Sequence, residues 1–105
     1  TGQGYDLNLI KMVSEEITVP LIAHGGCSNT QHIIDSVNFG ADAICIASLL
    51  HYNLMTKFYN VENNYKDEGN INFLRSRKIS KRFSNSDNLT NIKKAVKSKN
   101  IFIRI

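Results

Sequence analysis

The chain has 105 residues, of which 42% are hydrophobic and 21% are charged. This length fits one domain at most, and the apolar content excludes an intrinsically disordered chain. The sequence contains neither the pattern of a secretory signal peptide nor an apolar run long enough to span a membrane. Its charge is uneven: residues 1–52 carry one lysine and five carboxylates, whereas residues 53–105 carry twelve lysines or arginines and four carboxylates.

The basic half of the chain suggests two interpretations, a nucleic-acid or partner surface and an ordinary solvated surface. Its densest run, residues 75–83, comes with neither a stacking platform nor a recognition motif. We therefore favour a solvated surface and expect neither nucleic acid nor a membrane as a partner. The two cysteines, Cys27 and Cys45, lack metal-ligand spacing, which suits reduced residues of a cytoplasmic protein with no metal and no cofactor.

The first predicted elements are a helix and a strand. Asp6 is a good N-cap, and apolar residues at helical spacing predict a helix from Leu7 to Ile17 that ends before Pro20. The short apolar run from Leu21 to His24 then predicts a buried strand.

A second helix and a second strand follow. The helix opens at Ser28 or Asn29, where Ser28 and Gln31 have the spacing of a capping box, and it closes at Gly40. The strand from Ala43 to Ala47 is apolar throughout, as expected for a parallel strand covered on both faces. Alternation places Ala43, Cys45 and Ala47 on one face and turns Ile44 and Ile46 toward the helices.

The rest of the chain is less regular. Residues 53–90 are rich in Asn, Lys and Ser and predict an irregular insert, and a last helix is expected near Thr90 to Ser98. The chain begins at Thr1 rather than Met, and two strands do not make a stable sheet alone. We therefore expect residues 1–105 to be a C-terminal fragment of a longer α/β protein.

The turn between the first strand and the second helix is the best candidate site. Gly25-Gly26 follows the strand directly, so the backbone can approach a ligand, and the next helix offers free N–H groups. A strand, a glycine turn and a helix in this order commonly bind phosphate. The alternative is an ordinary tight turn without a ligand.

Three blocks of sequence together resemble one family: residues 1–7, residues 20–27 and residues 40–52. The chain is similar there to the cyclase subunit of imidazole glycerol phosphate synthase (HisF-type), a (β/α)8 TIM barrel of about 250 residues. The resemblance implies that this chain is the C-terminal part of such a barrel, about its last two strands with their helices, followed by the insert and the terminal helix.

The resemblance also implies an activity. Such a cyclase takes ammonia from a glutaminase (HisH-type) partner and combines it with a phosphorylated formimino ribonucleotide to form imidazole glycerol phosphate and a carboxamide ribonucleotide. Its two catalytic acids lie upstream of the residue that matches Thr1, so we expect no catalytic residue in this chain. The substrate phosphate would be bound by Gly25 and Gly26 after one strand and by Ala47 and Ser48 after the next. The hydroxyl of Ser48 could instead cap the following turn.

His24 departs from the family, which commonly carries a small residue there. Alternation places His24 with Ile22 at the barrel mouth, so it either lines the active site or is a structural histidine. We expect His51 to be structural and His32 to lie on the surface. His24 and the 53–90 insert favour an alternative function, that of a cyclase-like partner that delivers ammonia to a sugar amidotransferase in surface-polysaccharide synthesis.

Overall fold

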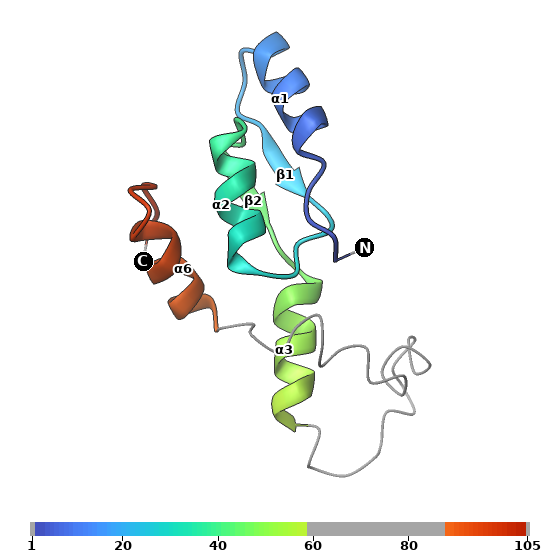
Figure 1. Ribbon diagram of the computed structural model, residues 1–105, viewed down its shortest axis with the longest axis vertical. Helices are drawn as coiled ribbons and strands as arrows, with labels where there is room; N and C mark the ends of the chain where they lie inside the picture. Colours follow the sequence, from blue (N-terminus) through green and yellow to red (C-terminus); the bar gives the residue numbers. More distant parts are fainter. Residues whose placement is uncertain (1, 59–87, 105) are drawn as a thin grey trace.

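The computed structural model describes residues 2–58 and 88–104, with side chains to residue 54 in the first range. Its elements are α1 (Leu7–Glu16), β1 (Ile22–His24), α2 (Thr30–Asn38), β2 (Ala43–Cys45), α3 (Ser48–Phe58) and α6 (Leu89–Lys97). In Figure 1, β1 and β2 lie side by side behind α1 and α2, and α6 lies beside α2. None of the described helices is long and apolar enough to cross a membrane.

The two strands pair in parallel, as the sequence predicts, with Ile22 opposite Ala43 and His24 opposite Cys45. At their amino ends, Asp42 links the two: its carboxylate accepts the Leu21 N–H at 2.8 Å, and its own N–H donates to the Leu21 carbonyl at 2.9 Å. Because the carboxyl ends of parallel strands meet at one edge, the loops after β1 and β2 emerge together.

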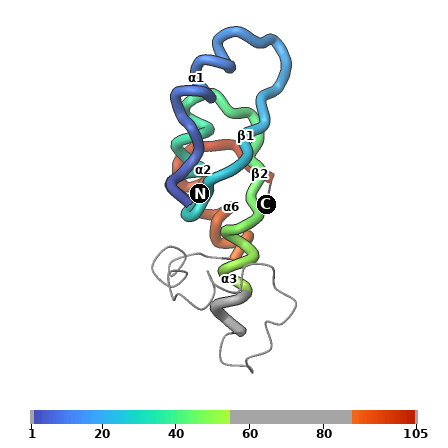
Figure 2. Tube along the Cα trace, turned by 90° about the vertical axis from the view of Figure 1, so that its right-hand side faces the viewer, coloured from blue at the N-terminus to red at the C-terminus, as the bar shows by residue number. Residues whose placement is uncertain are grey.

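The helices cover only one face of this two-stranded sheet, which Figure 2 shows from the side. Ala23 on the covered face is 5% exposed, and Ile44 and Ile46 pack against the same core. On the other face Ile22 is 64% exposed, and Ala43, Cys45 and Ala47 are exposed with it. The predicted alternation is thus confirmed, and one apolar face of the sheet is open.

The core lies between the sheet and α2. Ile33 and Ile34 of α2 are buried, and Ile92 and Val96 of α6 cover the helix from the outside. At the end of α2, the Ala41 N–H donates to Ser36 and the Gly40 N–H to Val37, each at 3.0 Å. This is a Schellman motif, and the φ of +115° at Gly40 explains why a glycine ends this helix, as predicted.

Several boundaries differ from those predicted. Helix α1 ends one residue early, β1 begins at Ile22 rather than Leu21, and β2 ends at Cys45 rather than Ala47. The last difference arises because the Ala47 carbonyl accepts the N–H groups of Leu50 and His51 and so begins α3. Residues 53–58 are helical, and the rest of the predicted insert, residues 59–87, lies outside the described residues. The last helix is found where the sequence predicts it.

Residues 1–105 alone should form at best a loosely packed state, because large apolar side chains such as Ile22, Met12 and Val19 are more than half exposed. We expect a broad thermal transition and strong binding of an apolar dye. A sharp, cooperative transition of the isolated monomer, followed by calorimetry, would contradict this expectation.

Candidate functional site: the loops at the carboxyl ends of β1 and β2

The turn after β1 is built from two glycines with left-handed backbone. Gly25 has a φ of +99° and Gly26 a φ of +88°. A Cβ at Gly25 would meet nothing within 4 Å, whereas a Cβ at Gly26 would collide with the Gly4 carbonyl oxygen. Gly26 is therefore required by conformation and by space, and Gly25 by conformation alone.

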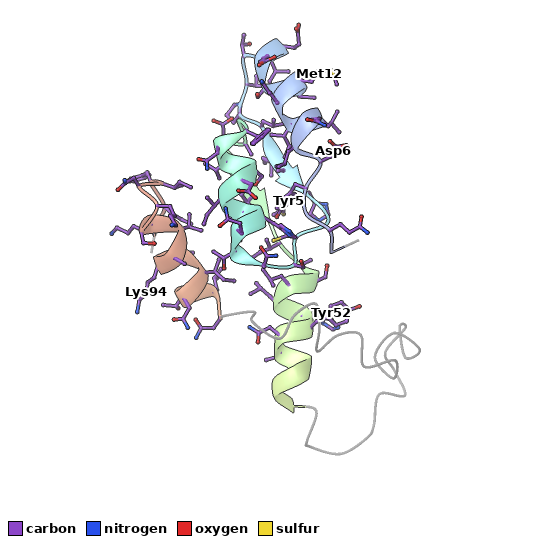
Figure 3. The ribbon with its side chains drawn as sticks, in the orientation of Figure 1. Tyr5, Asp6, Met12, Tyr52 and Lys94 are labelled. Carbon is purple, nitrogen blue, oxygen red and sulfur yellow. The ribbon has the colours of Figure 1, made fainter. Side chains whose placement is uncertain are left out.

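The segment before α1, residues 2–5, crosses the carboxyl ends of both strands. The Gly4 N–H donates to the Gly26 carbonyl at 2.9 Å, and the Ser28 hydroxyl donates to the Gly2 carbonyl at 2.8 Å. The Tyr5 hydroxyl donates to the Cys45 carbonyl at 3.0 Å, so the same segment contacts the end of β2. In Figure 3, Tyr5 lies beside the end of β1. These bonds hold the loop after β1 and the end of β2 in one fixed arrangement.

Tyr5 is buried and uncharged. Burial raises the pKa of its hydroxyl far above the ordinary value, and the neighbouring Cys27 thiol adds to the shift. Burial likewise raises the pKa of Cys27, although contacts with Tyr5 and the Asn29 backbone oppose that rise. A neutral Tyr5 keeps its proton for the Cys45 carbonyl over the whole physiological pH range.

The start of α2 differs from the predicted capping box. Asn29, not Ser28, is the N-cap, and its side-chain oxygen accepts the His32 N–H at 3.0 Å. Gln31 donates to the Asp35 carboxylate at 2.7 Å instead of reaching back. The residue three positions after the N-cap is thus His32, whose ring turns back over the loop.

His32 does not lie on the surface, so that expectation was wrong. Its ring is half-buried, its Nδ1 accepts the Ser28 N–H at 3.3 Å, and its Nε2 lies 3.3 Å from the Asn29 side-chain nitrogen. The ring also covers Gly4, where a Cβ would come within 3.4 Å of it. The sequence does contain a pattern that predicts this position of His32: Asn29 and His32 have the spacing of a capping box.

The residues predicted to bind phosphate all lie in the two loops at this edge. Gly25 and Gly26 follow β1 directly, Ala47 and Ser48 follow the paired end of β2, and Ser48 opens α3. Within residues 2–58 and 88–104, the N–H groups of Gly26 and Ser48 have no hydrogen-bond acceptor. Both are free to bind an anion, and the positive end of the α3 dipole lies at Ser48.

The predicted mouth residue, His24, ends β1 on the open face. It is exposed, and it lies on the same side of the sheet as Ile22 and Cys45, its partner in β2. His51 is also exposed; its ring makes an edge contact with Tyr52 at 5.0 Å. Among the described residues no group of three or more His, Cys, Asp or Glu side chains could hold a metal ion.

Comparison with known proteins identifies the family. The model of the family described as "Histidine biosynthesis protein" matches residues 1–56, and the chain belongs to this family. The match covers the segment across the strand ends, α1, both strands, α2 and most of α3.

Curated relatives give a more specific likeness. The chain is 49% identical over 53 residues to "Imidazole glycerol phosphate synthase subunit HisF" of Methanococcus maripaludis. These aligned residues make up 50% of this chain and 20% of that protein. The proteins of the same name from Microcystis aeruginosa and Pyrobaculum aerophilum are 47% identical over 57 residues and 39% identical over 56, in each case 53% of this chain and 22% of the relative. The chain thus spans about a fifth of the length of the relatives it matches.

Replacing Tyr5 by Phe should lower the stability of the intact protein by about 1 kcal/mol at neutral pH, because the Cys45 carbonyl loses its donor. The effect should change with pH. Folded Tyr5 keeps its proton above pH 10, where the unfolded chain releases it, so its contribution is present below pH 10 and is lost as the pH rises further.

Urea unfolding between pH 8 and pH 11 tests this. Above pH 10, the free energy of unfolding of the wild type should fall by up to about 1.4 kcal/mol per pH unit more than that of Tyr5→Phe. Parallel pH profiles of the two proteins would show that the Tyr5 hydroxyl is not buried against Cys45.

Proposed function

We propose that residues 1–105 are the C-terminal part of a (β/α)8 barrel, called the complete barrel below, in which β1 and β2 are neighbouring strands. The open face of the sheet supports this. A closed barrel fills its interior with side chains from alternate positions of each strand, and Ile22, Ala43 and Cys45 occupy such positions. Their exposure here matches the absence of the strands that would face them.

The complete barrel, we propose, is the cyclase subunit of imidazole glycerol phosphate synthase in histidine biosynthesis. The observation that carries this proposal is that the matched residues 1–56 contain a fully formed pair of loops at the carboxyl ends of the strands, where barrel enzymes bind their substrates. The reaction forms imidazole glycerol phosphate and a carboxamide ribonucleotide from a phosphorylated formimino ribonucleotide and ammonia. A glutaminase subunit of the HisH type is the proposed partner that supplies the ammonia.

In this mechanism the chain binds substrate and does not supply the acid and base. The Gly26 and Ser48 N–H groups donate to a substrate phosphate, Gly25 allows the turn, and the Ala47 carbonyl orients the first turn of α3. Fixing the phosphate holds the rest of the substrate over the barrel mouth, where the two carboxylates of the preceding strands would act. The comparisons give no support to the alternative, an ammonia-delivery partner of a sugar amidotransferase.

A segment exchange tests the function. The matched segment of the Methanococcus maripaludis relative is replaced by residues 1–56 of this chain, and formation of imidazole glycerol phosphate from ammonia is assayed. Turnover within about tenfold of the parent supports the proposal. A folded exchange protein that binds phosphate but has no turnover would contradict it.

The phosphate site can be tested with two glycine variants that carry similar backbone strain. Gly26→Ala pushes a methyl group into the Gly4 carbonyl and should weaken phosphate binding to the complete barrel at least tenfold. Gly40→Ala is the matched control, since it has the same strain and a collision with Ser14 but lies at the opposite ends of the strands. Titration calorimetry should show near-normal affinity for Gly40→Ala, and equal losses in both variants would refute a phosphate role for the turn.

His24 should make phosphate binding depend on pH. A protonated histidine beside a bound anion attracts it, so the affinity for phosphate should fall as the pH rises. His24→Ser should remove much of this dependence in titrations of the complete barrel between pH 5.5 and pH 8.5. If phosphate affinity depends on pH in the same way after the substitution, His24 has only a packing role.

A further inference from the structure

The His32 side chain contacts both the loop after β1 and the segment that crosses the strand ends. It does so from the first turn of α2. Its Nδ1 lies 3.3 Å from the Ser28 backbone nitrogen and 3.4 Å from the Ser28 hydroxyl, and its Nε2 lies 3.3 Å from the Asn29 side-chain nitrogen. The face of the ring covers Gly4.

We propose that His32 is the positioning residue of the phosphate-binding loop: by accepting the Ser28 N–H, it turns that donor away from the ligand and fixes the curvature of residues 25–29. This inference rests on the proposed phosphate role of Gly26 and Ser48. Accepting the Ser28 N–H requires the neutral tautomer that carries its proton on Nε2 and leaves the lone pair of Nδ1 free. Without such an acceptor the Ser28 N–H is unpaired in a largely buried position, and the loop loses one of the bonds that hold its shape.

The geometry shows why a ring nitrogen matters more than bulk. The Ser28 hydroxyl already donates to the Gly2 carbonyl, and the Asn29 side-chain oxygen already accepts the His32 N–H. Both side chains are thus already held in place by bonds to other groups. Gly26 lies two residues before Ser28, and its carbonyl is bonded to Gly4, which the ring covers. A displaced ring would thus loosen the hydrogen bond between Gly26 and Gly4 and also the position of Ser28, two residues further along the loop.

Two substitutions separate hydrogen bonding from packing. His32→Phe keeps the ring and its cover of Gly4 but removes both nitrogens. His32→Asn loses bulk, but its side-chain oxygen occupies the place of Nδ1 and can accept the Ser28 N–H. Gln31→Ala is the control, because Gln31 lies on the same turn of α2 and its side chain donates to the Asp35 carboxylate and to nothing else in the described part of the chain.

The experiment measures inorganic phosphate binding by the complete barrel, together with the amide proton exchange of Ser28. We expect His32→Phe to weaken phosphate binding about tenfold and to speed the exchange of the Ser28 amide proton. His32→Asn should stay within about threefold of the wild type in both measurements. Gln31→Ala should behave like the wild type. In turnover assays the His32→Phe loss should fall on KM rather than kcat. If His32→Phe binds phosphate normally, or if His32→Asn is as impaired as His32→Phe, the positioning role is refuted. A wild-type barrel that fails to bind phosphate would instead refute the proposed function, whatever the variants do.

Discussion

The arrangement of the site depends on a short stretch of backbone, residues 2–5, lying across the carboxyl ends of two parallel strands. Its hydrogen bonds reach the loop after β1 through Gly4 and the end of β2 through Tyr5. A two-stranded sheet is marginal by itself, and strands this short have few ladder bonds to fix their relative position. The crossing segment adds contacts at one end, and Asp42 adds them at the other. Both loops that carry the candidate phosphate ligands are thereby held at a defined separation.

The crossing segment also accounts for the glycines of the region. Gly4 and Gly26 approach each other so closely that a side chain on Gly26 has no space, and the His32 ring fills the space beside Gly4. Left-handed backbone at Gly25 and Gly26 then turns the chain from the strand into α2 within a few residues. The shape of the site is thus set by close contacts between backbone segments, chiefly those of Gly4 and Gly26, rather than by charged side chains.

Much of this arrangement could be predicted from the sequence. Apolar spacing located α1 and α2, the alternation in β2 assigned its faces correctly, and Gly40 marked a helix end. The glycine turn and the end of β2 could be placed at one edge because parallel strands align their carboxyl ends. Periodicity did not reveal that residues 48–58 form a helix, since apolar and polar residues do not separate clearly onto two faces there. The role of His32 was missed for another reason: it depends on a contact with Ser28 and Gly4, and the contact with Gly4 is tertiary.

The two faces of the sheet carry different residues: one face packs into the core, and the other is open. The covered face contributes Ala23 and Ile44 to a core shared with α2 and α6. The open face carries His24 and Ile22 from β1 beside Ala43 and Cys45 from β2, a mixture of one polar ring and smaller apolar groups. Because side chains alternate along a strand, a register shift of one residue would bury His24 under α2 and expose Ala23. The Tyr5 bond to Cys45 and the Asp42 bond to Leu21 oppose such a shift from the two ends. The same bonds that stabilise the pair of strands therefore decide which residues face the proposed substrate.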